Sequence, residues 1–209
     1  MKYLLLLLSI CLSAALDSFA QEKKQSAYVT SASPTSLENI DDALKILNFN
    51  IYNINLPVDS QKSYQMKVYL EEYDKGMKLK KSDTVRYEII GKDAIRKVEP
   101  KLSVIIRDLN DTTITMLFKT PEGERISLVK KDAMYNIKHM GKIFKSQPLI
   151  PGKKIPLLLY GSMWHDSSLP KDAVRFCMER QLAPDFSSEA FTSMPHYYLI
   201  FVEITEKLK

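Results

Sequence analysis

The sequence predicts an all-β, mainly antiparallel protein: a two-sheet β-sandwich with one or two short helices. Apolar and polar residues alternate with a period of two over many short segments, which is typical of half-buried strands. Turn-forming residues separate these segments, and no helical pattern recurs between them, so parallel β-α-β winding is disfavoured. About nine or ten strands are expected at this spacing, and a β-barrel is the alternative because it shows the same pattern.

The N-terminal elements follow from local patterns. The helical spacing of four apolar residues predicts a short helix over 37–47, and an irregular first strand is the alternative. Alternation predicts strands over 49–56 and 64–71. A turn at 74–76 contains Gly, and the next strand is expected over 85–89.

Two consecutive hairpins are predicted in the middle of the chain. The first covers residues 102–118, where two β-rich runs flank Asn110 and Asp111. Both residue types tolerate the positive φ that a tight hairpin turn requires. The second hairpin turns at 121–123 and continues into a strand over 125–129.

The C-terminal part begins with turns expected at 140–142 and 150–152, each containing a glycine. A short apolar strand is predicted over 155–160, and a short helix over 172–182 with an aspartate as its N-cap. The last strand, 196–204, is apolar on nearly every residue. A strand that is apolar on both faces is expected in the interior of a sheet, with layers on either side.

The N-terminus predicts a secretory signal peptide over residues 1–20. A positive residue precedes an apolar stretch at 4–16, and Ser18 and Ala20 are the small residues that a cleavage site requires. The apolar stretch is short for a membrane span. The alternatives are an uncleaved N-terminal anchor and a lipoprotein modified at Cys11.

Cleavage after the leader divides the chain further. Residues 21–36 are polar and rich in serine, and we expect a flexible N-terminal segment there. Residues 37–209 are expected to form a single β-sandwich domain. The mature protein is expected to be exported, either periplasmic or outer-surface/secreted, with no transmembrane span. Cys177 would then be its single cysteine, so no internal disulfide is expected.

Two segments resemble small exported proteins of Bacteroidetes that have no assigned function. They are residues 50–57, NIYNINLP, and residues 69–76, YLEEYDKG, which follow a Leu-rich leader. The resemblance implies a β-rich periplasmic or outer-surface protein. Because neither segment is a catalytic motif, it implies no site residue.

Cofactor and metal motifs are missing from the sequence. The six glycines are too widely spaced for a phosphate-binding loop, and no His-Glu-x-x-His segment occurs. We therefore expect no cofactor and no metal. The alternative is a zinc site assembled from distant residues of the right ligand types, namely His165, Asp166, Cys177 and His196.

The candidate ligand-binding residues are Trp164, His165 and Asp166. This stretch holds the single tryptophan of the chain and follows an apolar strand. A tryptophan in a loop can stack on a sugar or anchor a protein partner, and a tryptophan that covers the core is the alternative.

The charge balance adds information on partners. The net charge is +5 and the lysines are clustered, which would suit an acidic polysaccharide or anionic lipid. Lysines that protect strand edges are the simpler explanation. Nucleic acid is not expected, because no binding motif occurs and export would separate the two.

The predicted function is a non-enzymatic, exported interaction or binding module of the cell envelope, with an envelope protein or a glycan as ligand. The predictions favour a protein without enzymatic activity, because no catalytic motif is present. The alternative is a periplasmic hydrolase with a site assembled around His165 and Asp166.

Overall fold

The computed structural model describes residues 44, 46–47, 49–96, 98–130, 139–166, 168–170 and 173–207. Every described residue lies within 41–209, which forms one compact unit. The predictions for residues 1–20 and 21–36 therefore lie outside the described residues. The same holds for most of the helix expected over 37–47.

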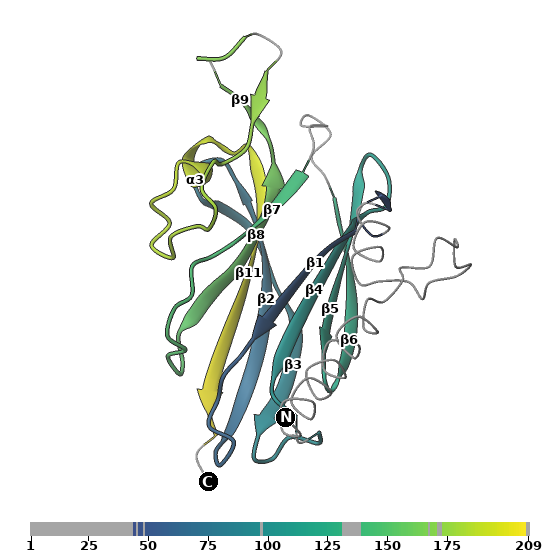
Figure 1. The fold of residues 1–209 in the computed structure, drawn as a ribbon, viewed down its shortest axis with the longest axis vertical. Coiled ribbons are helices and arrows are strands. Elements are labelled where there is room, and N and C mark those ends of the chain that lie inside the picture. Colours follow the sequence, from purple (N-terminus) through teal and green to yellow (C-terminus); the bar gives the residue numbers. More distant parts are fainter. Residues whose placement is uncertain are drawn as a thin grey trace, which may run out of the picture. The chain divides into compact units, whose positions relative to one another are not determined.

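Four antiparallel strands form one sheet, which we call sheet A (Figure 1). Their order across the sheet is β1 (Phe49–Asn55), β4 (Lys101–Asp108), β5 (Thr113–Thr120) and β6 (Gly123–Lys130). The two hairpins predicted around residues 110–111 and 121–123 are confirmed as β4–β5 and β5–β6.

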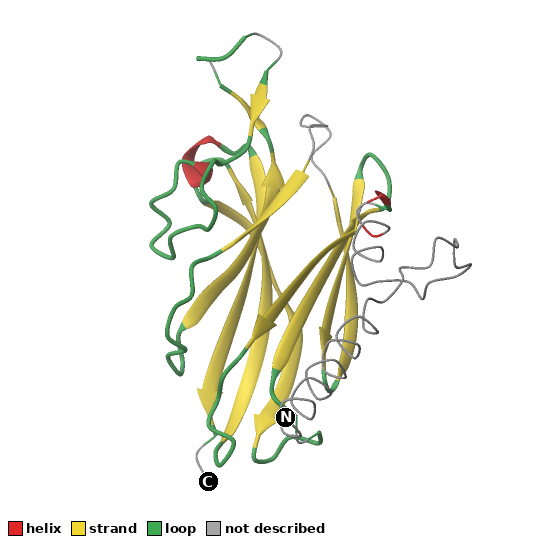
Figure 2. Ribbon diagram, in the orientation of Figure 1, coloured by secondary structure: helices red, strands yellow, loops and turns green. Residues whose placement is uncertain are grey.

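Five antiparallel strands form the second sheet, sheet B. Their order is β3 (Lys78–Gly91), β2 (Ser63–Asp74), β11 (His196–Glu206), β8 (Lys154–Ser162) and β7 (His139–Ile143). A two-stranded ribbon joins β9 (Trp164–His165) to β10 (Val174–Arg175). The one labelled helix is α3 (Ala190–Ser193), a single turn drawn in red beside sheet B in Figure 2. Within the described part of the chain, helices are too short or too polar to cross a bilayer.

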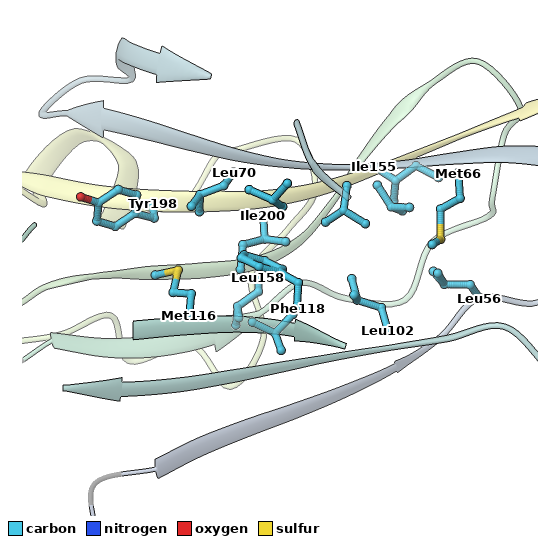
Figure 3. Close-up of a cluster of buried hydrophobic side chains, with 14 of the residues drawn as sticks. Leu56, Met66, Leu70, Leu102, Met116, Phe118, Ile155, Leu158, Tyr198 and Ile200 are labelled. Atoms are coloured by element: carbon cyan, nitrogen blue, oxygen red, sulfur yellow. The ribbon is translucent and has the colours of Figure 1, made fainter. Parts of the chain in front are cut away.

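The two sheets enclose one hydrophobic core. Leu102 and Phe118 of sheet A point into it, as do Leu158 and Ile200 of sheet B, and none of these four side chains is exposed (Figure 3). The architecture is therefore an antiparallel two-sheet β-sandwich, as predicted. Both sheets, as far as they are described, have two end strands, so the barrel alternative is wrong.

Strand β11 lies at the centre of sheet B and is buried on both faces, which confirms the interior position predicted for it. Its inward residues join the core between the sheets, and its outward residues join a second apolar cluster on the outer face of sheet B. Residues Phe176, Leu182 and Phe191 of the segment between β8 and β11 cover that outer face. Sheet B is thus the middle layer of the domain.

Two local predictions are wrong. The stretch predicted as a helix at 172–182 contains β10 followed by an irregular segment in its described part, because Phe176 and Leu182 reach the second cluster from an extended chain. The turn expected at 140–142 is instead part of β7. Gly141 is needed there because a Cβ atom would lie 2.0 Å from the hydroxyl of Tyr52 on β1.

Candidate functional site

The three residues predicted to bind ligand lie together on the β9–β10 ribbon. Trp164 is 5% exposed and packs against Phe176 in the second cluster. His165 is exposed, whereas Asp166 forms a 2.9 Å ion pair with Arg175. The guanidinium carbon of Arg175 also lies over the ring of Trp164, 5.5 Å from the ring centroid. The ribbon therefore offers one exposed imidazole beside a carboxylate that is already paired with an arginine, and its role in binding stays a prediction.

Asp166 is held in its charged form by its neighbours. Hydrogen bonds from the backbone and hydroxyl of Ser168, together with the charge of Arg175, lower the pKa of the Asp166 carboxyl. A carboxylate with these partners is suited to fix a loop. A general acid requires the opposite shift.

The wider set considered as zinc ligands does not converge. His165 is on β9 and His196 begins β11, while Cys177 is half-buried after β10. Burial raises the pKa of the Cys177 thiol, which disfavours the thiolate that binds zinc. Among the described residues, no three His, Cys, Asp or Glu side chains are grouped so that they could hold a metal ion.

The structure does assemble a polar group that sequence reasoning missed, on the inner face of sheet B. We call it the polar row; it consists of Glu72, His196, Ser162 and His139 on four adjacent strands. Nε2 of His196 lies 3.0 Å from a carboxylate oxygen of Glu72. Ser162 donates a 3.2 Å hydrogen bond to the backbone carbonyl of His196.

The polar row is built for stability more than for chemistry. His196 is 1% exposed and Ser162 has no exposed surface, so a substrate would have no access to either side chain. The serine hydroxyl donates to a carbonyl, whereas a nucleophilic serine donates to its general base. Burial raises the pKa of Glu72, but hydrogen bonds from His196 and Lys80 outweigh burial and leave the pKa lowered.

A groove runs beside sheet A, between β1 and the chain from β7 to β8. We call it the β1 groove, and its cavity volume is about 440 Å³. Its polar lining consists mainly of the amide side chains Asn53, Asn55, Gln147 and Gln181. Its apolar lining includes Ile54, Leu149 and Leu157, and its one charged lining residue is Lys145. Apolar walls with a few polar groups are typical of ligand-binding sites.

The strand that borders this groove has an unprotected edge. β1 contains no charged residue and no proline, and its seven residues pair with β4 in continuous register. No other described strand pairs with its opposite edge. Natural sheets protect exposed edges with charges, prolines, bulges or very short strands, and β1 has none of these features.

The three other sheet edges are protected. β3 carries Lys78, Lys80 and Lys81, and its pairing with β2 is interrupted by two register shifts. β6 carries three charged residues, and β7 is five residues long and contains Lys142. The contrast singles out β1 and its groove as the best candidate site in the described part of the chain.

Comparison with known proteins gives a family and no function. A family model described as "Domain of unknown function (DUF5041)" matches residues 19–206. No curated protein and no solved structure matches the chain. Because the family model covers nearly the whole chain, the protein belongs to the DUF5041 family.

Proposed function

We propose that this protein is a non-enzymatic, exported binding module of the cell envelope, and that it binds an extended segment of another envelope protein. The bound segment would add a strand to sheet A along the open edge of β1, with side chains entering the β1 groove. The observation that carries this proposal is the uncharged, unbulged edge of β1 beside an amide-lined cavity.

Strand addition explains why this edge lacks protection. An added strand needs a regular row of free backbone N–H and C=O groups, and charges or bulges would interrupt that row. Main-chain hydrogen bonds would supply affinity, and every second side chain of the ligand would face the groove. The amides of Asn53 and Gln181 could then select polar side chains of the ligand, while Ile54 and Leu157 accept apolar ones.

The location in the envelope is supported by the sequence. Residues 1–20 have the pattern of a secretory signal peptide. The similarity of residues 50–57 to exported Bacteroidetes proteins points in the same direction. That segment contains most of β1 and the start of the groove lining, so the resemblance and the candidate site coincide.

The hydrolase alternative has weaker support. Asp166 is engaged by Arg175 and Ser168, and among the described residues His165 belongs to no group of His, Cys, Asp or Glu side chains that could hold a metal ion. A glycan ligand would suit the amides of the β1 groove, but Phe144, its one aromatic lining residue, is 6% exposed and offers little stacking surface. An extended protein segment therefore fits the observations best.

The test is site-specific photo-cross-linking in the native envelope. Benzoylphenylalanine replaces Asn55, which is exposed beside the groove, and in a matched control it replaces Thr84 on the protected edge of β3. We expect the probe at position 55 to cross-link to a segment of one protein, and the probe at position 84 not to cross-link to that segment. A synthetic peptide of that segment should then slow hydrogen exchange of the β1 backbone amides and leave the β3 amides unchanged.

Edge-blocking variants complete the test. Asn53→Lys with Asn55→Lys places two cations on β1 and should weaken peptide binding at least about tenfold, because each charge obstructs strand addition. Thr84→Lys should leave binding unchanged. Absence of a protein cross-link at position 55 would overturn strand addition as the function. So would slower hydrogen exchange of the β1 amides with chitotetraose, a glycan probe, but with no peptide.

A further inference from the structure

The outer face of sheet A carries an apolar surface that the sandwich does not use. Because side chains alternate along each strand, this face can be read from the register. One aligned row crosses all four strands and consists of Ile51, Ile105, Leu117 and Ile126. Neither hydrophobic cluster includes this row, and Ile126 is 61% exposed.

The same face is positively charged around the apolar row. Lys101, Arg107, Lys119 and Lys130 point outward by the same alternation. The acidic residue Glu124 lies opposite Lys119 in the register. One neighbouring position in the next row is Leu128, which is 66% exposed. The surface thus combines exposed aliphatic side chains with an excess of cations.

We propose that the outer face of sheet A docks on an anionic lipid bilayer. Aliphatic side chains would enter the interface between headgroups and acyl chains, while the cations bind the headgroups. Lysine suits this arrangement because its apolar stem can lie along the aliphatic row while its ammonium group stays in the headgroup layer.

The composition of the face favours lipid over a protein partner. Protein interfaces are enriched in aromatic residues and arginine and depleted in lysine. Here three of the four cations are lysines, and the exposed apolar residues are isoleucine and leucine. The aromatic residue of this face, Phe49, lies under the guanidinium of Arg107 at 5.0 Å. A complementary anionic surface is the partner that these charges select.

The two faces of the domain differ in a way that supports this assignment. The outer face of sheet B is covered by Phe176, Leu182 and Phe191 of the same chain. The outer face of sheet A keeps aliphatic residues at its centre, although polar residues are the rule on a solvated sheet face. An apolar face retained without a cover in the described residues indicates a surface used in binding.

The experiment measures co-sedimentation of the protein with phosphatidylcholine vesicles that contain about 30% phosphatidylglycerol, an anionic lipid. The protein is purified from cells that export it. We expect binding that falls at least about tenfold in the Lys101→Glu/Lys119→Glu variant. The control Lys75→Glu/Lys153→Glu makes the same change in net charge at turns away from this face, and should bind within about twofold of the natural protein.

A second pair of substitutions separates surface docking from attraction by net charge. Ile126→Ser with Leu128→Ser should weaken binding about tenfold with no change in charge, because apolar contact contributes to binding at the interface. Circular dichroism confirms that each variant is folded. Absence of binding to anionic vesicles, or equal losses in the two lysine variants, would overturn the proposal. Capture of a protein with no affinity for vesicles would also overturn it.

Discussion

Lys154 and Glu71 form an ion pair that reaches across β11, the central strand of sheet B, with Nζ of Lys154 2.6 Å from a carboxylate oxygen of Glu71. Glu71 is 5% exposed and also accepts hydrogen bonds from Tyr73 and Ser82. The ammonium group lies 4.0 Å above the ring of Tyr69. The pair therefore ties three strands together on the outer face of the sheet.

This ion pair predicts a loss of stability in acid. Burial raises the pKa of Glu71, but hydrogen bonds from Lys154, Tyr73 and Ser82 outweigh burial, so its pKa in the folded state is lowered from the ordinary value of 4.5. The folded state then binds this proton less tightly than the unfolded chain. The stabilising contribution is present above about pH 4.5 and disappears as the pH falls through the lowered pKa.

Glu71→Gln tests the acid prediction. The variant should lose about 1–3 kcal/mol at pH 7, because a charged acceptor is replaced by a neutral one at a buried position. Its stability should fall less than that of the natural protein between pH 5 and pH 3, as measured by urea denaturation. Glu124→Gln, on the exposed part of β6, is the control. An unchanged slope with pH in Glu71→Gln would contradict the assignment.

Sequence patterns predicted most of the fold because strand alternation and turn residues are local signals. The hairpins at residues 110–111 and 121–123 and the apolar character of β11 needed no knowledge of distant contacts. The stretch at 172–182 failed because its apolar residues are buried by the second cluster, which only the tertiary fold creates. Gly141 looked like a turn residue for the same reason: Tyr52, which excludes a side chain there, is far away in the sequence.

The polar row and the candidate site at β1 were less accessible to sequence reasoning. Glu72 and His196 are 124 positions apart, and only the register of β2 with β11 brings them together. The unprotected edge of β1 was visible in the sequence as a strand without charge, but its position at the end of a sheet was not. Trp164, the most conspicuous single residue, is buried beside Phe176, a contact that no local pattern indicates.

The close approach of Tyr52 on β1 to Gly141 on β7 predicts that any side chain at position 141 destabilises the domain. Gly141→Ala would place Cβ 2.0 Å from the Tyr52 hydroxyl, so the side chain or β7 must move. We expect a loss of about 1–3 kcal/mol, the usual cost of overpacking. In the background of Tyr52→Ala the same change should cost almost nothing, which a double-mutant cycle by urea denaturation would measure. Additive effects would show that the two residues do not meet.

The proposed export predicts a defined N-terminus. Ser18 and Ala20 provide the small residues that signal peptidase requires, so the mature protein should begin at Gln21. Mass spectrometry of the exported protein measures this directly. Ala20→Leu should block cleavage, and the matched change Ala27→Leu should leave it unaffected. A retained leader, or a lipid attached to Cys11, would contradict the prediction.

The central position of β11 predicts that folding depends on it. Ile200 has no exposed surface and lies in the core between the sheets, where β11 is paired with β2 on one side and with β8 on the other. Ile200→Ala should therefore cost about 2–5 kcal/mol in the free energy of unfolding, because the cavity is enclosed and cannot collapse fully. That is a large part of the roughly 5–15 kcal/mol that stabilises a typical domain. Lys207→Ala, at the polar end of the chain, should cost little.

Truncation makes the same argument without a point substitution. Deleting residues 205–209 removes the end of β11, including the exposed Thr205, and leaves its buried part in place, so the domain should stay folded. Deleting 196–209 separates β2 from β8 and opens both apolar clusters to water, so cooperative unfolding should be lost. Thermal denaturation followed by circular dichroism distinguishes the two truncated proteins. A monomeric product of the longer deletion with an intact unfolding transition would contradict this prediction. It would mean that β2 and β8 can be held together, and the two apolar clusters kept stable, without the strand that they share.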